Sequence, residues 1–287
     1  MTQLPEDDHE QYTFDPFARH AFYYTVNQAL VREVMQHLPP ASSPDTSLQI
    51  IELASGTGLV TQIILEEVQR LGRTAHIICI EPSKEARDLA SAHLPGNDIV
   101  FLDGDVDQLD HITQGIDLVF CCNAIHLIPQ KQALIAQIAS LLVPGGLFGC
   151  NTAFFVGATP PQEGSDFNFL LIRRALAWLH QHYPAIRPSR RGQTASVQWL
   201  SANEYTALIN EQGLSIVAST LEDVQMPIEA VQDIGGYWLF IEGALPGVPI
   251  PIGAQALRQA AVEAAKELHL SAVPRIWLQL IAQKSPE

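Results

Sequence analysis

Acidic residues and glycines stand at the end of an apolar segment in the first half of this chain. Residues 49–53 form an apolar run that contains Glu52, and the turn Ala54-Ser55-Gly56-Thr57-Gly58 leads from it into a helical pattern over 59–71. This order is typical of a nucleotide-binding strand, turn and helix at the carboxyl edge of a parallel sheet. The glycines let the backbone approach a ligand closely, which a Cβ would prevent.

The same turn argues against two common ligands. A dinucleotide-binding turn needs a third glycine in the pattern G-x-G-x-x-G, and Thr61 occupies that position. The chain also contains no G-x-x-x-x-G-K-[ST] segment, so a phosphate-binding loop of that type is not supported.

Four further segments follow in a fixed order. They are residues 77–83, 101–106, 116–126 and 141–147, and each combines an apolar run with an acidic residue, an asparagine or a Gly-Gly turn. Together with 52–58 they resemble the class I S-adenosylmethionine-dependent methyltransferases, whose first motif is acidic-x-G-x-G-x-G. Ala54 replaces the first glycine of that motif, and alanine is the smallest substitute. The resemblance covers about residues 45–156.

This resemblance implies that each site residue contacts a different part of S-adenosylmethionine. Glu81 would accept both ribose hydroxyls, and Asp105 would accept from the adenine amino group while Val106 packs on the ring. Glu52 would face the amides of the turn or the ammonium group through water. A solvated Glu81 and an Asp105 that only shapes a turn are the alternatives. The expected cofactor-binding residues are Glu52, Ala54, Gly56, Gly58, Glu81, Asp105, Val106 and Asn123.

A candidate general base follows the fourth expected strand. His126 lies a few residues beyond it, near where the resemblance places the methyl group, and a neutral imidazole can remove a proton near pH 7. Methyl transfer needs a base only when the acceptor must lose a proton. The alternative is a histidine that packs the start of the next helix.

Basic and aromatic residues gather between 173 and 199 of an otherwise acidic chain. They suggest a pocket for a substrate with an anionic group beside an apolar or aromatic body, or else an amphipathic surface helix. The expected substrate-binding residues are Tyr23, Tyr24, Arg173, Trp178 and Trp238.

The composition of the chain indicates which classes of substrate and ligand to expect. The chain has 287 residues, 47% of them hydrophobic, and a formal net charge of -15. Proteins that bind nucleic acid need a basic surface to meet phosphates, so a small-molecule substrate is favoured. Four cysteines without C-x-x-C spacing indicate buried thiols of a cytoplasmic protein, and they give no metal site. No apolar run reaches the roughly 18 residues of a membrane-spanning helix, and the sequence leaves the oligomeric state unknown.

Alternating strand and helix patterns predict the fold. We expect an α/β protein with a Rossmann-like, doubly wound, mainly parallel seven-stranded sheet, an antiparallel last strand and helical cap insertions. The expected parts are an arm and helix over 1–44, a cofactor-binding core over 45–156, a cap insertion over 157–200, more core over 201–226, a second cap insertion over 227–272 and the last strand over 273–287.

The first 18 residues contain Tyr12, Phe14 and Phe17, which are unusual in a disordered tail. We therefore expect residues 1–38 to form a lid that shields the methyl group from water. The function expected overall is methyl transfer from S-adenosylmethionine to O, C or N of a small apolar or aromatic metabolite, for example in secondary metabolism. Two alternatives stay open: a catalytically silent S-adenosyl nucleotide-binding regulator, and a nicotinamide-dependent oxidoreductase.

Overall fold

The computed structural model describes residues 11–39, 47–94, 96, 98–113, 115–161, 163–189 and 199–286. The chain divides into two compact units. We call the first the sheet unit (Tyr24–Ala158, Gln198–Glu222 and Trp277–Glu287) and the second the helical unit (Met1–Tyr23, Thr159–Val197 and Asp223–Ile276).

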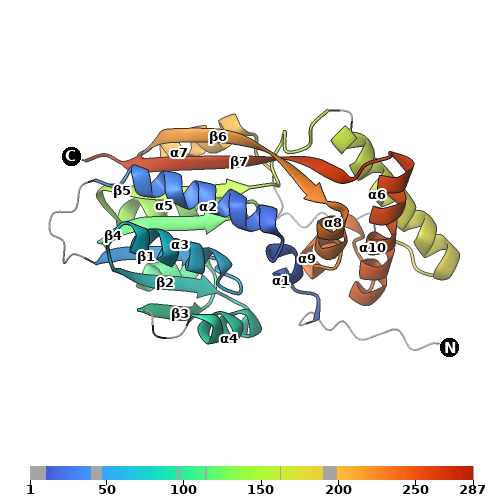
Figure 1. The fold of residues 1–287 in the computed structure, drawn as a ribbon, viewed down its shortest axis with the longest axis horizontal. Helices are drawn as coiled ribbons and strands as arrows, with labels where there is room; N and C mark the ends of the chain where they lie inside the picture. The colour runs from blue at the N-terminus through green and yellow to red at the C-terminus, as the bar shows by residue number, and fades with distance from the viewer. Residues whose placement is uncertain are drawn as a thin grey trace. The chain divides into compact units, whose positions relative to one another are not determined.

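Seven strands of the described residues form one sheet (Figure 1). Its order is β3-β2-β1-β4-β5-β7-β6; β1 to β5 pair as parallel neighbours, and β7 runs antiparallel to β5. The expected doubly wound sheet with an antiparallel last strand is therefore confirmed. The strands are β1 (Leu48–Leu53), β2 (Ala75–Glu81), β3 (Ile99–Asp103), β4 (Ile116–Cys122), β5 (Leu142–Thr152), β6 (Leu214–Pro227) and β7 (Ala272–Lys284).

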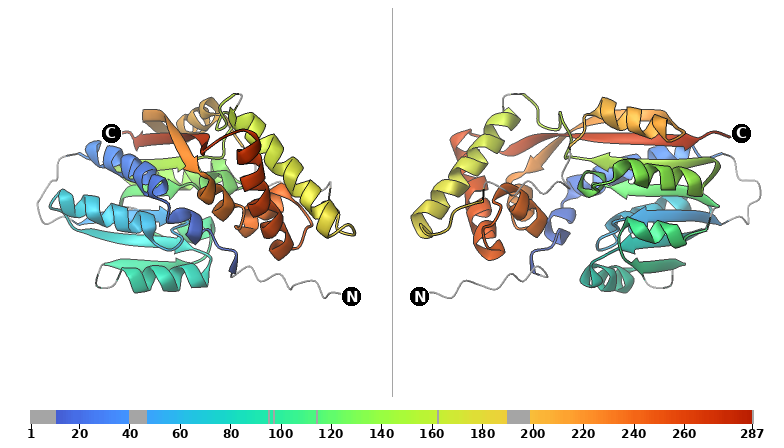
Figure 2. Two further views of the ribbon diagram at one scale, coloured as in Figure 1. Left: turned by 45° about the vertical axis from the view of Figure 1, so that its right-hand side comes forward. Right: turned by 180° about the vertical axis from the view of Figure 1, so that it is seen from behind.

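Helices cover both faces of this sheet. Helices α2 (Ala21–Gln36) and α3 (Leu59–Arg70) lie on one face, and α5 (Lys131–Leu141) and α7 (Ala202–Glu211) lie on the other (Figure 2). Alternate strand residues such as Leu48 and Ile50 pack against α2 and α3, because successive side chains of a strand point to opposite faces. Helix α4 (Lys84–His93) follows β2.

Helix α2 approaches the sheet closely at one point. A Cβ built on Gly149 of β5 would lie 2.6 Å from a methyl group of Val34. Val26, Leu30 and Val34 are buried at four-residue spacing and form an apolar stripe on α2. Gly149 therefore makes room for this stripe.

One turn lies elsewhere than expected. The Gly-Gly turn that the sequence shows in the segment 141–147 lies inside β5, which already begins at Leu142. Its pairing with β4 shifts register between Ile116 and Leu118, and Gly145 has a φ of 79°. The Pro-Gly-Gly segment is therefore an irregularity inside the strand, which sequence patterns do not distinguish from a turn.

The helical unit has a core of its own. It contains α1 (Asp15–Ala18), α6 (Glu163–His182), α8 (Ile228–Ile234), α9 (Trp238–Ala244) and α10 (Ile250–Glu267). Small buried residues at four-residue spacing on α10, namely Ala256, Ala260 and Ala264, let α6 pack closely against it. The helices of both expected cap insertions belong to this unit, and their role as a cap stays a proposal.

Four buried cysteines occupy the strands of the sheet unit. Cys79, Cys121, Cys122 and Cys150 are all free thiols, as the sequence predicts. Within the ranges that the structure describes, no helix has the length and apolarity to cross a membrane. In those same ranges, no three His, Cys, Asp or Glu side chains are grouped as metal ligands.

Candidate functional site

The turn after β1 has an unusual backbone. Ala54, Gly56 and Gly58 have φ values of 54°, 55° and 86°, in the left-handed region that favours glycine. A Cβ at Gly58 would lie 3.0 Å from Leu94 and 3.1 Å from Ala90, whereas one at Gly56 would meet no atom within 4 Å. Gly58 thus allows close packing on α4, whereas Gly56 borders open space.

Glu81, the last residue of β2, is tied to this turn. One of its carboxylate oxygens accepts the backbone N–H of Gly56 at 2.9 Å, and the other accepts that of Ser83 at 3.0 Å. The side chain is nine-tenths buried. A carboxylate oxygen has two lone pairs, so both oxygens keep acceptor capacity for further donors.

Glu52 lies deeper than Glu81. It is 2% exposed, and its carboxyl group accepts the hydroxyl of Thr61 on α3 at 2.6 Å, with the thiol of Cys79 at 3.9 Å. Burial raises the pKa of Glu52 to about 8, so the group is protonated at neutral pH. The donors to Glu52 are therefore Thr61 and Cys79, whereas the sequence predicts the amides of the turn or the ammonium group. The reason is that the Glu52 side chain points into the protein from its position in β1.

Asp105 and Val106 follow β3. One Asp105 carboxylate oxygen accepts the backbone N–H of Val106 at 2.7 Å and caps the short helix η2 (Val106–His111). The Asp105 side chain is exposed and Val106 is half-buried. The turn-forming alternative therefore describes the contact of one Asp105 oxygen, and binding of adenine by the other oxygen stays a prediction.

Asn123 follows β4, next to the glycine turn. In the sheet, Leu53 of β1 is in register with Cys121 of β4, so the segments after both residues reach the same edge. Asn123 is 7% exposed and has a φ of 51°. Ligands of open α/β sheets bind at this edge where the strand order reverses, here between β1 and β4.

His126 lies in the short helix η3 (Ile125–Leu127) and is 5% exposed. Its Nδ1 atom is 3.1 Å from the hydroxyl of Thr152, and its ring centroid is 4.5 Å from that of Phe154. The buried ammonium group of Lys131 donates to the carbonyls of His126 at 3.3 Å and Ile128 at 2.8 Å. The ring and the backbone of His126 are thus both fixed by neighbours in the sheet unit.

The two expected substrate-binding tyrosines point to different surroundings. Tyr23 is 5% exposed and packs its ring against Phe14 and Phe17 in the helical unit. Tyr24 donates its hydroxyl to Glu66 of α3 at 2.5 Å, and this hydrogen bond raises its pKa. Adjacent residues of a helix point about 100° apart, so the two rings have different neighbours, and their part in substrate binding stays a prediction.

The other three expected substrate-binding residues belong to the helical unit. Arg173 is exposed and pairs with Glu267 at 3.3 Å. Trp178 stacks on His182 with ring centroids 4.4 Å apart, and Trp238 donates its backbone N–H to the carbonyl of Tyr12 at 3.0 Å. Trp178 and Trp238 both pack against the core of the helical unit, and the part of all three residues in substrate binding stays a prediction.

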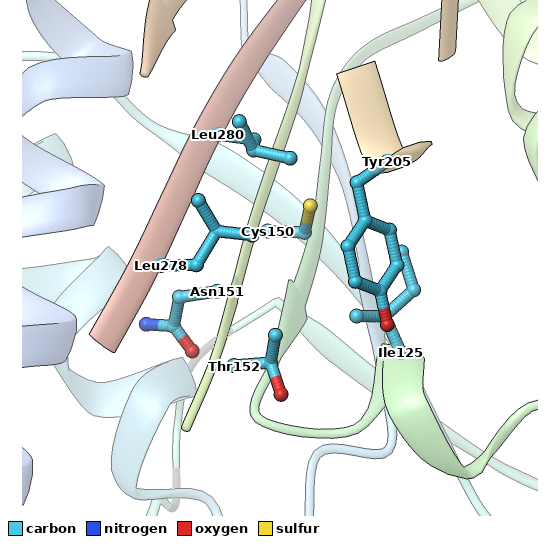
Figure 3. Close-up of a pocket in the computed structure, with 7 residues that line it drawn as sticks. All are labelled: Ile125, Cys150, Asn151, Thr152, Tyr205, Leu278 and Leu280. Atoms are coloured by element: carbon cyan, nitrogen blue, oxygen red, sulfur yellow. The ribbon is translucent and has the colours of Figure 1, made fainter. Parts of the chain in front are cut away.

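A small pocket lies beside β5, between this strand and residues of η3, α7 and β7 (Figure 3). It is lined by residues of η3, β5, α7 and β7: Ile125, Cys150, Asn151, Thr152, Tyr205, Leu278 and Leu280. The Tyr205 hydroxyl is buried, and burial raises its pKa. None of the expected site residues lines this pocket, so it is separate from the cofactor turn.

The comparisons with known proteins agree with this geometry. Residues 50–146 match the family model described as a methyltransferase domain. The matched segment contains the glycine turn, Glu81, Asp105, Asn123 and His126. Residues 50–146 thus contain a methyltransferase domain, and the sheet order is that of the class I S-adenosylmethionine-dependent methyltransferases.

Individual relatives of this chain are distant. A malonyl-[acyl-carrier protein] O-methyltransferase of Chlorobium phaeovibrioides is 29% identical over 136 residues, which are 46% of this chain and 50% of that protein. An uncharacterized methyltransferase of Oceanobacillus iheyensis is 28% identical over 174 residues, which are 58% of this chain and 78% of that protein. The chain thus spans about half the length of the malonyl O-methyltransferase.

A solved loganic acid methyltransferase with S-adenosylhomocysteine has the same fold. Its TM-score is 0.66 with 13% sequence identity, over 98% of each chain. S-adenosylmethionine is the cofactor of this family of methyltransferases. The residues of the site fit this cofactor, because the left-handed turn borders open space at Gly56 and Glu81 retains acceptor capacity beside it.

Sequence reasoning missed three residues that hold the site residues in place. Thr61 occupies the position of the missing third glycine, and its hydroxyl donates a hydrogen bond to Glu52. Thr152 and Lys131 contact His126, although neither belongs to a motif. A lysine at the start of a helix is normally solvated, so no signal in the sequence could indicate its burial.

Proposed function

We propose that this methyltransferase transfers a methyl group from S-adenosylmethionine to an oxygen atom of a small apolar or aromatic molecule. The observation that carries the proposal is the 2.9 Å hydrogen bond between Gly56 N–H and Glu81, which links the turn after β1 to the end of β2. This bond fixes a carboxylate beside a left-handed turn, as recognition of a ribose requires.

Each site residue has a proposed part in binding. Glu81 accepts the ribose hydroxyls, and the backbone of Ala54, Gly56 and Gly58 lines the cofactor. Asp105 accepts from the adenine amino group with its free oxygen, while Val106 packs on the ring. Glu52 supports the turn from below through Thr61.

Methyl transfer from S-adenosylmethionine requires few catalytic groups from the protein. S-adenosylmethionine supplies an activated methyl group, so alignment of the acceptor and exclusion of water are the main tasks of the chain. His126 would remove the proton from a hydroxyl acceptor. A carboxylate acceptor is already ionised at neutral pH and would need no base.

Oxygen is chosen over carbon or nitrogen because of the relatives. The printed name of the Chlorobium protein, which is 29% identical over 136 residues, specifies an O-methyltransferase. The acidic chain, with its net charge of -15, favours a small molecule over nucleic acid.

The test combines binding and turnover. Isothermal titration should show binding of S-adenosylhomocysteine and none of NAD. A mixture of benzoate, cinnamate, 4-hydroxybenzoate and malonyl-N-acetylcysteamine should then accept tritiated methyl groups from S-adenosylmethionine. Binding of NAD in place of S-adenosylhomocysteine would favour the oxidoreductase, and cofactor binding with no transfer would favour the silent regulator.

A further inference from the structure

The side-chain amide of Asn123 has a fixed direction. Its Oδ1 atom accepts the backbone N–H of Ala153 at 3.0 Å. A backbone N–H can only donate, so the oxygen must face Ala153 and the amide cannot be flipped. Nδ2 therefore points away from that contact as a donor.

Two further asparagines, Asn151 and Asn27, fix the position of Asn123. The backbone N–H of Asn123 is 2.9 Å from both the backbone carbonyl and the side-chain oxygen of Asn151. Asn151 in turn donates its amide to Asn27 at 2.8 Å, and both residues are at least 99% buried. Because these contacts fix the position of Asn123, they also stabilise its left-handed backbone, which is strained for a residue other than glycine.

Nδ2 of Asn123 takes no part in this hydrogen-bond network. The atom is buried and has no hydrogen-bond partner among the residues that the structure describes. A buried donor without a partner destabilises a protein, and such groups in native structures call for an explanation. At the ligand-binding edge of the sheet, the simplest explanation is an oxygen atom of a bound molecule.

The surroundings indicate which molecule supplies that oxygen. The cofactor contacts proposed above come from the ends of β1, β2 and β3, whereas Asn123 follows β4 and stands three residues before His126 in the sequence. Phe154 lies against His126, and its ring centroid is 5.9 Å from that of Trp199. An apolar or aromatic body suits these rings better than the polar methionine portion of the cofactor does.

We propose that Asn123 Nδ2 donates a hydrogen bond to the acceptor oxygen and thereby selects oxygen acceptors. This inference rests on the proposed function, and it assigns Asn123 to the acceptor instead of the cofactor. A donor at this point orients a neutral oxygen and stabilises an anionic one. With a hydroxyl acceptor, the proton leaves to His126 and the new O–methyl bond forms as the methyl–sulfur bond breaks.

Two substitutions separate the donor from the rest of the side chain. Asn123→Asp keeps the acceptor for Ala153 but has no donor in its ionised form. Asn123→Gly removes both groups and suits a φ of 51°. An effect that both variants share therefore belongs to the lost donor, and circular dichroism with thermal melting checks that both variants fold.

Titration with S-adenosylhomocysteine and turnover of the four-compound mixture give the answer. We expect both variants to bind S-adenosylhomocysteine within about threefold of the wild type, and kcat/KM to fall about 10- to 100-fold in Asn123→Gly. Asn123→Asp should fall further, because its charge repels an anionic oxygen. Each methyl product should carry the label on oxygen.

Other results overturn the inference. Weakening of S-adenosylhomocysteine binding by more than about tenfold in both variants would assign Nδ2 to the cofactor. Unchanged turnover in Asn123→Gly, or label on carbon or nitrogen, would remove it from acceptor recognition. A wild-type enzyme that binds the cofactor but methylates none of the four compounds refutes the inference and the oxygen acceptor together. Failure to bind S-adenosylhomocysteine at all refutes the proposed function itself.

Discussion

Glu81 and Gly56 are 25 residues apart in sequence, and a 2.9 Å hydrogen bond joins the carboxylate of the first to the backbone N–H of the second. The bond makes the shape of the glycine turn depend on an acidic residue of the neighbouring strand. A change at Glu81 should therefore alter both the charge of the site and the conformation of the turn.

Glu81→Gln tests this coupling. The neutral amide has one oxygen, so it cannot accept from both Gly56 and Ser83 while also binding ribose hydroxyls. We expect the dissociation constant for S-adenosylhomocysteine to rise about 10- to 100-fold, because hydrogen bonds to charged groups contribute about 1.5 to 3 kcal/mol. Isothermal titration measures the change. Glu211→Gln, at an exposed position in α7, is the matched control, and equal affinity in the two variants would exclude Glu81 from the site.

Glu52 should make stability depend on pH. Its pKa is about 8 in the folded protein and near 4.5 in the unfolded chain, so the folded state holds the proton more tightly between these values. The stabilisation is complete below the lower pKa and is lost as pH rises through the upper one. Glu52→Gln has no ionisable group at this position, so its free energy of unfolding does not decrease for this reason as the pH rises.

Urea unfolding at pH 5 and pH 8.5 measures the effect. The free energy of unfolding of Glu52→Gln relative to wild type should increase by on the order of 2 to 4 kcal/mol from pH 5 to pH 8.5. Other ionisable groups cancel in this difference. A difference that is independent of pH would mean that the folded protein ionises Glu52 as readily as the unfolded chain does.

His126→Ala separates catalysis from packing. If His126 is the general base, kcat should fall about 10²- to 10⁴-fold while the affinity for S-adenosylhomocysteine is retained. Thr152→Val, which removes the hydroxyl at Nδ1, should shift the pH profile of kcat without abolishing turnover. Loss of folding in His126→Ala would support a structural role, and wild-type turnover would indicate an acceptor that needs no base.

Deletion of residues 1–18 tests the expected lid. Phe14 packs on Tyr237 with ring centroids 5.4 Å apart, and Tyr12 accepts the backbone N–H of Trp238, so this segment belongs to the core of the helical unit; residues 1–10 lie outside the described residues. The truncated protein should bind S-adenosylhomocysteine but transfer methyl groups poorly. Unchanged turnover, or failure of the sheet unit to fold, would each contradict the lid hypothesis.

The four cysteines should be inert in the folded protein. Burial raises the pKa of Cys121 to about 12 and that of the other three thiols above its ordinary value, so the reactive thiolate is scarce at neutral pH. Ellman's reagent should detect almost no thiol before denaturation and four after it in guanidinium. Rapid reaction of the native protein would show that a strand of the sheet opens.

Much of the cofactor site follows from local sequence. The turn at Ala54-Ser55-Gly56-Thr57-Gly58 and the acidic end of β2 are patterns that one segment carries by itself, because strand periodicity and glycine conformation are local properties. The order of such segments predicted the doubly wound sheet, and the structure confirms it.

What the tertiary structure decided is which side chains meet. The amide of Asn123 acquires its direction from Ala153, and His126 acquires Thr152 and Lys131 as neighbours, all through the pairing of β4 with β5 and the packing of α5. The same is true of Tyr23 and Tyr24, adjacent in sequence but packed in different units. Contacts between distant segments depend on strand register and helix rotation, which no single segment of sequence specifies.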